Sequence, residues 1–151
     1  MDGVLTDGGL INLTGSKWLR KTNMKDGHAI KLASQKGYRI LILSGSISKP
    51  VKKRMKFLGV SKVEMTAVDK KKKLEEYIKE HNLKSEEVLA MGDDVKDYSM
   101  LQMAGLSCCP SDAVSEIKQI SKYISPFKGG QGCVRDVIEK VLKLNGNWEL
   151  D

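Results

Sequence analysis

The chain has 151 residues, of which 40% are hydrophobic and 30% charged, a composition typical of a globular domain with one core. Its formal net charge of +7 suits nucleic acid or small anionic substrates, but aromatic residues make up only 5% of the chain, too few for a surface that stacks single-stranded bases. No apolar run approaches the roughly 18 residues that a membrane-spanning helix needs. Most lysines fall at helical spacing, which is typical of a solvated helix face. We therefore expect neither nucleic acid nor a membrane as a partner.

The cysteines indicate a reducing compartment. The chain has three of them, Cys108, Cys109 and Cys133, an odd number without the CxxC spacing of a zinc site or the pattern of a disulfide framework. The N-terminus also lacks a basic segment followed by an apolar one, so we expect no signal peptide. The expected location is cytoplasmic.

In chain order, the sequence opens with the motif MDGVLTDGG, which has no apolar run in front of it. Residues 9–22 follow, and in them LINL, a Thr-Gly turn and KWLRK predict a β-hairpin. From there, apolar runs typical of buried strands alternate with helical patterns. The expected strands are 39–43, 63–68, 88–91 and 106–109, and the expected helices are 27–36, 50–58, 71–81, 97–104, 112–121 and 134–144.

This alternation predicts an α/β domain, a parallel sheet with helices on both faces. Residues 1–144 are expected to form one domain with the hairpin standing over it as a flap, and residues 145–151 a C-terminal tail. Ligands bind such sheets beyond the carboxyl ends of the strands. Each expected strand is followed by a polar turn that carries Ser, Asp or Lys, so we expect a site at that edge.

The turn GDDVKD places three carboxylates within five residues. Carboxylates so close together repel one another unless a cation lies among them, and magnesium is typically held by one or two carboxylates plus a substrate phosphate. Asp93 is placed to meet the metal, with Asp97 behind it. The alternative is an acidic loop whose Asp side chains cap the next helix.

Two further turns favour phosphate binding. Ser44 and Gly45 offer a hydroxyl and a backbone N–H at a strand end, and Lys70 offers a compensating positive charge. The alternatives are a simple turn for Ser44-Gly45 and a solvated helix start for the run DKKKK that contains Lys70.

Taken in order, an acidic opening motif, Ser-Gly, Lys and GDDxxD resemble the haloacid dehalogenase superfamily. The stretches DGVLTDGG, NMKDGHAI, ILSG, RMKFLGV, VDK, MGDDVKD and GGQGCVRDV are similar to those of its cap-less phosphatases that act on 3-deoxy-D-manno-octulosonate 8-phosphate. The resemblance runs from Asp2 to about Leu144. It implies a Rossmann-like fold with a hairpin flap and no cap domain, Mg²⁺ as cofactor, and hydrolysis of that sugar phosphate in lipopolysaccharide precursor synthesis. It also implies a homotetramer in which a neighbour's hairpin, with Trp18, covers the active site.

The opening motif departs from the family pattern, which is Asp-x-Asp. The first Asp of that pattern attacks phosphorus, and the second protonates the leaving group and then helps to activate water. Asp2 matches the second Asp and Met1 the middle position, so the first Asp would stand one residue before Met1.

A buried central strand of five or six residues is likewise expected ahead of Met1, because the other site turns each follow one. Burying five aliphatic side chains is worth about 1.5–3 kcal/mol each, which rivals the roughly 5–15 kcal/mol stability of a whole domain. Two interpretations stand. Either the natural protein starts earlier and carries this strand and the nucleophile, or the chain is a pseudo-enzyme.

The resemblance assigns the remaining roles. Asp2 is the general acid/base, and its backbone carbonyl reaches the metal. Asp93 is the main carboxylate ligand with Asp97 in support, and Ser44 and Lys70 hold the phosphoryl oxygens. Lys25 and Arg54 are placed to pair with the sugar carboxylate. The substrate contacts implied are Asn23, Met24, Lys25, Asp26, Gly27, Lys31, Gly45, Ser46, Arg54, Lys70 and Lys96.

Position 46 leaves the sugar open. The octulosonate enzymes usually carry Arg there, and related enzymes for a nine-carbon ulosonate 9-phosphate tend to carry Glu, whereas this chain has Ser46. A non-catalytic oligomerisation module, similar to the C-terminal domains of animal sialic acid cytidylyltransferases, is a second class of function. The intact GDDVKD turn, Ser44 and Lys70 argue against it.

Overall fold

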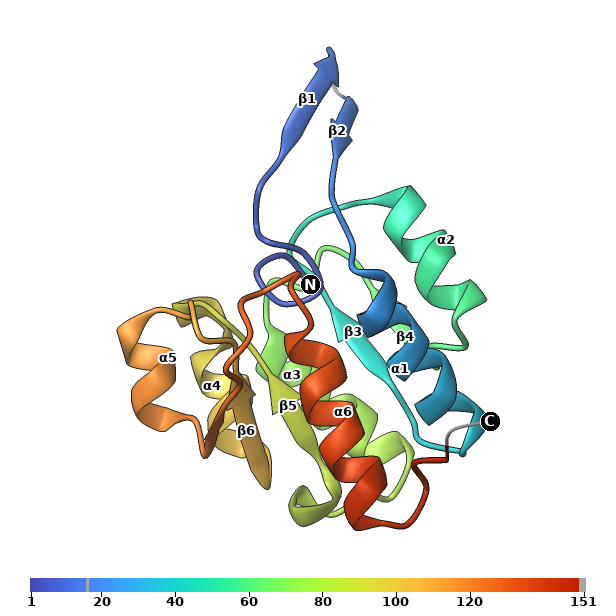
Figure 1. Ribbon diagram of the computed structural model, residues 1–151. Helices are drawn as coiled ribbons and strands as arrows, with labels where there is room; N and C mark the ends of the chain where they lie inside the picture. The colour runs from blue at the N-terminus through green and yellow to red at the C-terminus, as the bar shows by residue number, and fades with distance from the viewer. Residues whose placement is uncertain (16, 150–151) are drawn as a thin grey trace.

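The strands of the body form two separate parallel sheets in the computed structural model, which describes residues 1–15 and 17–149 (Figure 1). One sheet pairs β3 (Leu41–Leu43) with β4 (Lys62–Glu64). The other has the order β5 (Leu89–Met91), β6 (Leu106–Cys109) and β7 (Tyr123–Ile124). The neighbouring strands are parallel in both sheets, as the alternating pattern predicted.

Helices cover both faces of these sheets. One apolar cluster, around Ile42, is shared by α1 (Met24–Gln35), α2 (Lys49–Phe57) and α6 (Cys133–Leu144). The other, around Leu43, is shared by α3 (Lys70–Glu80), α4 (Tyr98–Met103) and α5 (Ser115–Ile120). Ile42 and Leu43 are neighbours in β3 yet enter different clusters, because successive strand residues point to opposite faces. No helix among the described residues is long and apolar enough to cross a membrane.

The expected elements are confirmed, with shifts at their ends. α1 begins at Met24 rather than at residue 27, because the Asn23 side chain accepts hydrogen bonds from the first backbone N–H groups of the helix. The expected strand 63–68 is shortened to β4, since the chain turns at Thr66, whose φ is +61°.

Two further helices differ from their expected ranges. The expected helix 97–104 is divided between the 3₁₀ turn η2 (Val95–Asp97) and α4. The expected helix 112–121 is shortened to α5, because residues 110–113 form a turn closed by the Ala113 N–H and the Pro110 carbonyl. The 3₁₀ turn η1 (Ser85–Glu87) and the two-residue strand β7 were not predicted, since such short segments carry no periodicity.

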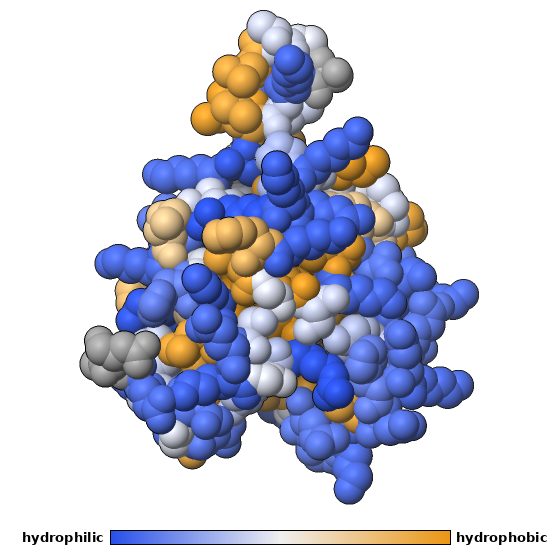
Figure 2. All heavy atoms as spheres, turned by 90° about the vertical axis from the view of Figure 1, so that its right-hand side faces the viewer, coloured by the Kyte–Doolittle hydropathy of each residue, from blue (hydrophilic) through white to orange (hydrophobic). Residues whose placement is uncertain are grey.

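The predicted hairpin is present as β1 (Ile11–Thr14) and β2 (Lys17–Leu19), which pair in antiparallel orientation. It stands away from the body of the domain (Figure 1). Its apolar side chains are exposed, with Ile11 62% and Trp18 51% accessible. Figure 2 shows hydrophobic residues gathered on one side of the projecting hairpin.

Candidate active site

The opening motif forms a turn at the carboxyl end of β3. The Val4 and Leu5 N–H groups donate to the Met1 carbonyl, at 3.3 and 2.9 Å, and the Met1 amino group donates to the Leu43 carbonyl at 3.5 Å. Met1 is buried, and burial together with nearby Lys70 lowers the pKa of its amino group. The beginning of this turn therefore lies inside the domain, directly beside the end of β3.

Asp2 is held by a guanidinium and a hydroxyl. The Arg20 Nε donates to Asp2 Oδ1 at 2.8 Å, and the Ser46 hydroxyl donates to Asp2 Oδ2 at 2.8 Å. Arg20 also donates to the Ser46 hydroxyl, at 3.1 Å. Burial by itself raises the pKa of Asp2, but the hydrogen bonds from Arg20 and Ser46 and the Arg20 charge outweigh it, so the pKa lies below its usual value. Asp2 is thus kept ionised in the unliganded protein.

The GDDVKD turn brings Asp93 against the opening turn and Asp97 against Lys70. A Cβ at Gly3, where φ is +79°, would lie 1.9 Å from Asp93 Oδ2, so glycine is what allows the carboxylate to approach this backbone. Asp97 is buried, and its two oxygens accept from Lys70 Nζ at 2.5 Å and from the Asp93 N–H at 3.0 Å. The structure therefore brings together Lys70, Asp93 and Asp97, which the sequence places after the ends of strands.

The three carboxylates have different partners. The sequence assigned the metal to the Asp93 carboxylate and the Asp2 backbone carbonyl, with Asp97 in support, and no group of three or more metal-binding side chains forms within residues 1–15 and 17–149. Asp2 is engaged by Arg20 and Asp97 by Lys70. Asp93 is the carboxylate left for a cation, because burial and the neighbouring charge of Asp97 raise its pKa to about 6. An oxygen donor with uncompensated negative charge is a suitable ligand for Mg²⁺.

Ser44 lies at the end of β3, as predicted. It is buried, its N–H donates to the Glu64 carbonyl at 2.9 Å, and its hydroxyl donates to the Ser46 carbonyl at 3.0 Å. The Ser44 and Ser46 hydroxyls lie 3.2 Å apart. Ser44, Ser46 and Asp2 therefore form one connected polar network at the edge where the strands end.

The glycine-rich run GGQG packs on the opening turn. The Gly130 N–H donates to the Val4 carbonyl at 2.9 Å, and a Cβ at Gly129 would lie 2.0 Å from the Gly3 carbonyl oxygen. The Asn23 amide donates to the Gly130 carbonyl at 3.3 Å. These contacts hold the start of α1, the GGQG run and the opening turn together.

Asp26 and Gly27 correct the sequence expectation of substrate contacts. Asp26 is 1% exposed and its Oδ1 accepts from the Arg135 N–H at 2.7 Å, so it caps the first turn of α6. Gly27 is buried, and a Cβ there would lie 3.0 Å from Arg54 Nη2. Both residues support the packing of neighbouring elements beneath the surface rather than facing solvent.

The cationic residues predicted to bind substrate are more accessible to solvent than Asp26 and Gly27. Lys25, Lys31 and Lys96 are exposed. Arg54 Nη2 donates to the sulfur of the exposed Met24 at 3.1 Å, while its buried Nε has no hydrogen-bond partner among the residues that the structure describes. A buried guanidinium N–H without a partner is a donor available to an incoming acid. Gly45 is exposed beside Ser44.

Two residues of the site were not predicted from the sequence. Arg20 directly follows β2 in the stretch KWLRK, where nothing in the sequence marks it apart from Lys17 or Lys21. Its side chain is only 6% exposed in the structure. Thr6 belongs to the opening motif, is fully buried and donates its hydroxyl to Asp2 Oδ1 at 3.3 Å. The sequence signal that could have identified Thr6 is its small hydroxyl side chain, four residues after Asp2.

The raised pKa of Asp93 predicts a pH dependence of stability. Folded Asp93 keeps its proton up to about pH 6, whereas the unfolded carboxyl loses it near pH 3.8. The folded state then binds more protons than the unfolded state in this window, so the stability of the metal-free protein falls as the pH rises through it. Thermal unfolding in EDTA from pH 4 to 7 should show this fall, and Asp93→Asn should flatten it. Equal slopes for both proteins would contradict the assignment.

Comparisons with known proteins identify the family. The family model of haloacid dehalogenase-like hydrolases matches residues 59–137, just over half of the chain. The 3-deoxy-D-manno-octulosonate 8-phosphate phosphatase KdsC of Escherichia coli is 27% identical over 149 residues, which cover 99% of this chain and 79% of that protein.

Solved structures give the same result. The 3-deoxy-D-manno-octulosonate 8-phosphate phosphatase of Moraxella catarrhalis, in complex with magnesium, phosphate and KDO, has a TM-score of 0.93 at 29% identity and covers 97% of this chain and 84% of its own. A probable YrbI-family phosphatase of Pseudomonas syringae has a TM-score of 0.93 at 32% identity over 97% of this chain and 83% of its own. The cobalt-bound Haemophilus influenzae phosphatase has a TM-score of 0.90 at 26% identity over 96% and 85%. The chain belongs to the haloacid dehalogenase-like hydrolases, among the phosphoric monoester hydrolases related to KdsC.

Proposed function

We propose that this protein hydrolyses 3-deoxy-D-manno-octulosonate 8-phosphate to the free sugar acid and phosphate. The observation that supports this most is that Asp2, Lys70 and Asp93 all act on the pKa of the buried Met1 nitrogen, which donates to the Leu43 carbonyl next to Ser44. A phosphate ester placed there would have a cation and hydroxyls for its oxygens and a carboxylic acid beside its leaving group.

The nucleophile in this proposal is an Asp joined directly to the Met1 nitrogen. That nitrogen is buried, and its pKa responds to the charges of Lys70, Asp97, Asp2 and Asp93. A side chain attached one residue earlier would therefore lie among these four groups. The carboxylate of such an Asp attacks phosphorus, the ester P–O bond breaks, and an aspartyl-phosphate forms.

Asp2 then acts twice. It donates a proton to the departing sugar oxygen, and later it accepts a proton from the water that attacks the aspartyl-phosphate and releases phosphate. Arg20 and Ser46 keep the pKa of Asp2 low in the unliganded protein. The negative charge of a bound phosphate raises that pKa, because like charges disfavour a second ionised group, and so prepares Asp2 to carry the proton.

A divalent cation, proposed to be Mg²⁺, would be held by the Asp93 carboxylate, the Asp2 carbonyl and the nucleophile, with Asp97 in support through the Asp93 N–H. When bound, it supplies positive charge that offsets the charge of the phosphoryl oxygens. Lys70 holds Asp97 in place and keeps its remaining N–H donors for phosphate. The Ser44 hydroxyl, which donates to the Ser46 carbonyl without substrate, would turn to donate to the same oxygens.

The substrate class is an anionic sugar acid. Arg54, whose buried Nε lacks a partner in the described part of the chain, and the exposed Lys25 lie near the start of α1 and offer charged donors for a carboxylate. Ser46 is neutral and occupied by Arg20 and Asp2, so it selects neither acid by charge. The nine-carbon ulosonate 9-phosphate is therefore the second substrate to test.

The test measures phosphate release with Mg²⁺ from both sugar phosphates. The chain extended by a short apolar strand ending in Asp is compared with the same extension ending in Asn and with the 151-residue chain. Turnover by the Asp form alone supports the proposal. Absence of turnover by a folded Asp form on either sugar would favour a non-catalytic oligomerisation module.

We also propose that the protein assembles as a homotetramer through the hairpin. Large apolar surfaces exposed to water mark interaction sites, and Leu10, Ile11, Leu13, Trp18 and Leu19 are all between 45% and 62% exposed. We expect sedimentation velocity to show an assembly larger than a monomer, and Trp18→Asp to dissociate it. Lys17→Asp, on the same hairpin, should leave the assembly intact. A monomeric parent chain would contradict the proposal.

A further inference from the structure

Arg20 ties the base of the projecting hairpin to the active site. It directly follows β2, and its side chain is only 6% exposed, whereas Lys17 and Lys21 on either side of it are exposed. A buried guanidinium loses its hydration, so it needs partners that offset this cost. The partners of Arg20 among the described residues, Asp2 and Ser46, both belong to the catalytic edge.

Asp2, Arg20 and Ser46 form a closed ring of hydrogen bonds, here called the Asp2 ring. Arg20 Nε donates to Asp2 Oδ1 at 2.8 Å, and Arg20 Nη2 donates to the Ser46 hydroxyl at 3.1 Å. The Ser46 hydroxyl in turn donates to Asp2 Oδ2 at 2.8 Å. The ring uses two nitrogens at the fixed spacing of a planar guanidinium, which the single nitrogen of a lysine does not provide. The carboxylate is therefore held in one orientation.

The two oxygens of the Asp2 carboxylate are not equivalent in this ring. An ionised carboxylate has about four acceptor sites, two on each oxygen. Oδ1 accepts from Arg20 Nε and, at 3.3 Å, from the Thr6 hydroxyl, so both of its sites are taken. Oδ2 accepts only from the Ser46 hydroxyl among the described residues, so one of its sites is open. A proton can therefore be added at Oδ2 without breaking a contact of Oδ1.

The partner of Oδ2 also suits a carboxyl group that gains and loses a proton. Arg20 can only donate, so a proton on Oδ1 would oppose its N–H. A hydroxyl can donate or accept, and it rotates to suit its neighbours. When Oδ2 carries a proton, the Ser46 hydroxyl can turn to the Ser44 hydroxyl, which lies 3.2 Å away. The ring thus accommodates both forms of Asp2, provided that the proton is on Oδ2.

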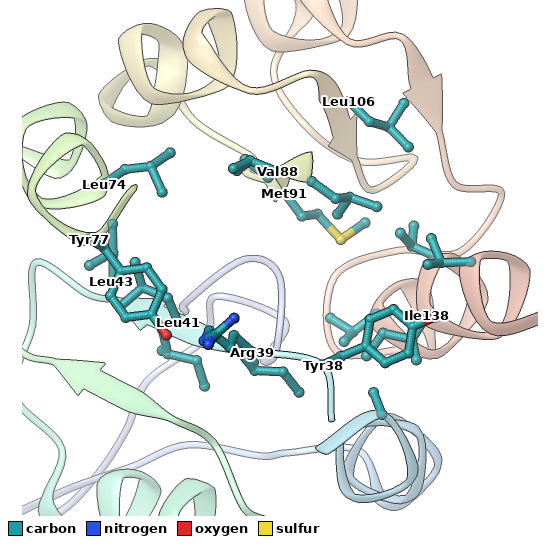
Figure 3. Close-up of a pocket in the computed structure, with 18 of the residues that line it drawn as sticks. Tyr38, Arg39, Leu41, Leu43, Leu74, Tyr77, Val88, Met91, Leu106 and Ile138 are labelled. Atoms are coloured by element: carbon teal, nitrogen blue, oxygen red, sulfur yellow. The ribbon is translucent and has the colours of Figure 1, made fainter. Parts of the chain in front are cut away.

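The Asp2 ring lies apart from the apolar cavity between β3 and β5. That cavity has a volume of about 700 Å³, and Figure 3 shows Leu41, Leu43 and Met91 among the side chains that line it. In the described part of the chain, its lining includes none of the three ring residues. The opening turn, the base of the hairpin and the segment after β3 therefore supply the ring, which can be tested in the 151-residue chain.

We propose that Arg20 is a positioning residue, and that Oδ2 is the atom through which Asp2 gives and takes its proton. Arg20 and Thr6 occupy Oδ1 and leave the open site of Oδ2 to the departing sugar oxygen. The Oδ2–H bond breaks as the sugar hydroxyl forms, and the attacking water later returns a proton to Oδ2. Proton transfer needs this orientation, because donor and acceptor must lie within hydrogen-bond distance. This catalytic part rests on the proposed function, whereas the ring itself does not.

The ring is tested in the 151-residue chain by NMR of the arginine side chains. Arg135 is the matched control, because its Nε pairs with Glu139 at 3.1 Å, but those side chains are 32% and 25% exposed. We expect the Arg20 Nε–H to exchange with water at least about 10-fold more slowly than the Arg135 Nε–H. Ser46→Ala should remove most of this difference and leave the exchange of Arg135 unchanged.

The positioning role is tested in the chain extended by a strand ending in Asp. We expect Arg20→Lys to lower kcat for phosphate release at least about 30-fold and to change KM by less than about threefold, because the substrate still binds while the acid is misoriented. Ser46→Ala should also lower kcat. The double variant should be no slower than Arg20→Lys alone, since either substitution opens the same ring. Lys21→Met, at the exposed neighbour of Arg20, should keep kcat.

Three results would overturn the proposal. Equal exchange of the Arg20 and Arg135 Nε–H groups would show that the ring does not form. A raised KM at unchanged kcat would make Arg20 a substrate contact, and additive losses would make Arg20 and Ser46 independent of each other. If the Arg20 Nε–H exchanges slowly but the extended parent chain releases no phosphate from either sugar, the ring stands and the proposed function fails.

Discussion

Replacing Lys70 by Met is expected to lower the free energy of unfolding by about 3–5 kcal/mol, because it leaves the buried Asp97 carboxylate without its cation. Lys70 Nζ lies 2.5 Å from Asp97 Oδ1, and the two side chains are only 14% and 6% exposed. Asp97 also accepts from the Asp93 N–H, so its displacement would disturb the turn that we propose to hold the metal. Urea unfolding monitored by circular dichroism measures the loss.

Lys73→Met is the matched control for this prediction. Lys73 is in the same helix and pairs with Glu76 at 3.0 Å, but those side chains are 42% and 49% exposed. Exposed pairs contribute about 0–1 kcal/mol. The double variant Lys70→Met with Asp97→Asn should recover part of the loss, since it removes the buried charge. Equal effects of the two lysine substitutions would contradict the role given to the Lys70–Asp97 pair.

The second large effect is expected for Asp93→Asn in the chain extended by a strand ending in Asp. We expect its Mg²⁺-dependent phosphate release to fall by at least about 100-fold, because the amide cannot supply the negative charge that holds the cation beside the phosphoryl group. A coupled phosphate assay at saturating Mg²⁺ measures kcat and KM separately.

Asp94→Asn is its matched control, one residue along the same turn. Asp94 is exposed, and its side chain accepts only from the Val95 N–H, at 2.8 Å, among the described contacts. It should keep most of the activity. A similar loss in both variants would show that the turn is needed for folding, and would contradict a specific role for Asp93.

The sequence predicted the elements whose pattern is local. Four short apolar runs, each followed by a polar turn, were enough to place the strands and to bring Ser44, Lys70 and Asp93 to one edge. Periodicity carries this information because it records which face of an element is buried. The hairpin could be predicted in the same way, because its turn and its apolar runs are adjacent in the sequence.

Contacts between distant segments could not be predicted in this way. Arg20 meets Asp2 and Ser46 across 18 and 26 positions of sequence, and only the path of the hairpin brings it there. Asp26 was expected to face the sugar, but it caps α6, more than a hundred residues further along the chain. A polar residue's partner depends on the fold as a whole, so its type and position leave the role undetermined.

One measurement tests the central claim most directly: phosphate release from 3-deoxy-D-manno-octulosonate 8-phosphate with Mg²⁺, by the 151-residue chain and by the chain extended with an apolar strand ending in Asp. We predict turnover by the extended chain and none by its Asn counterpart. A folded, extended chain that releases no phosphate from this sugar or from its nine-carbon relative would contradict the phosphatase assignment.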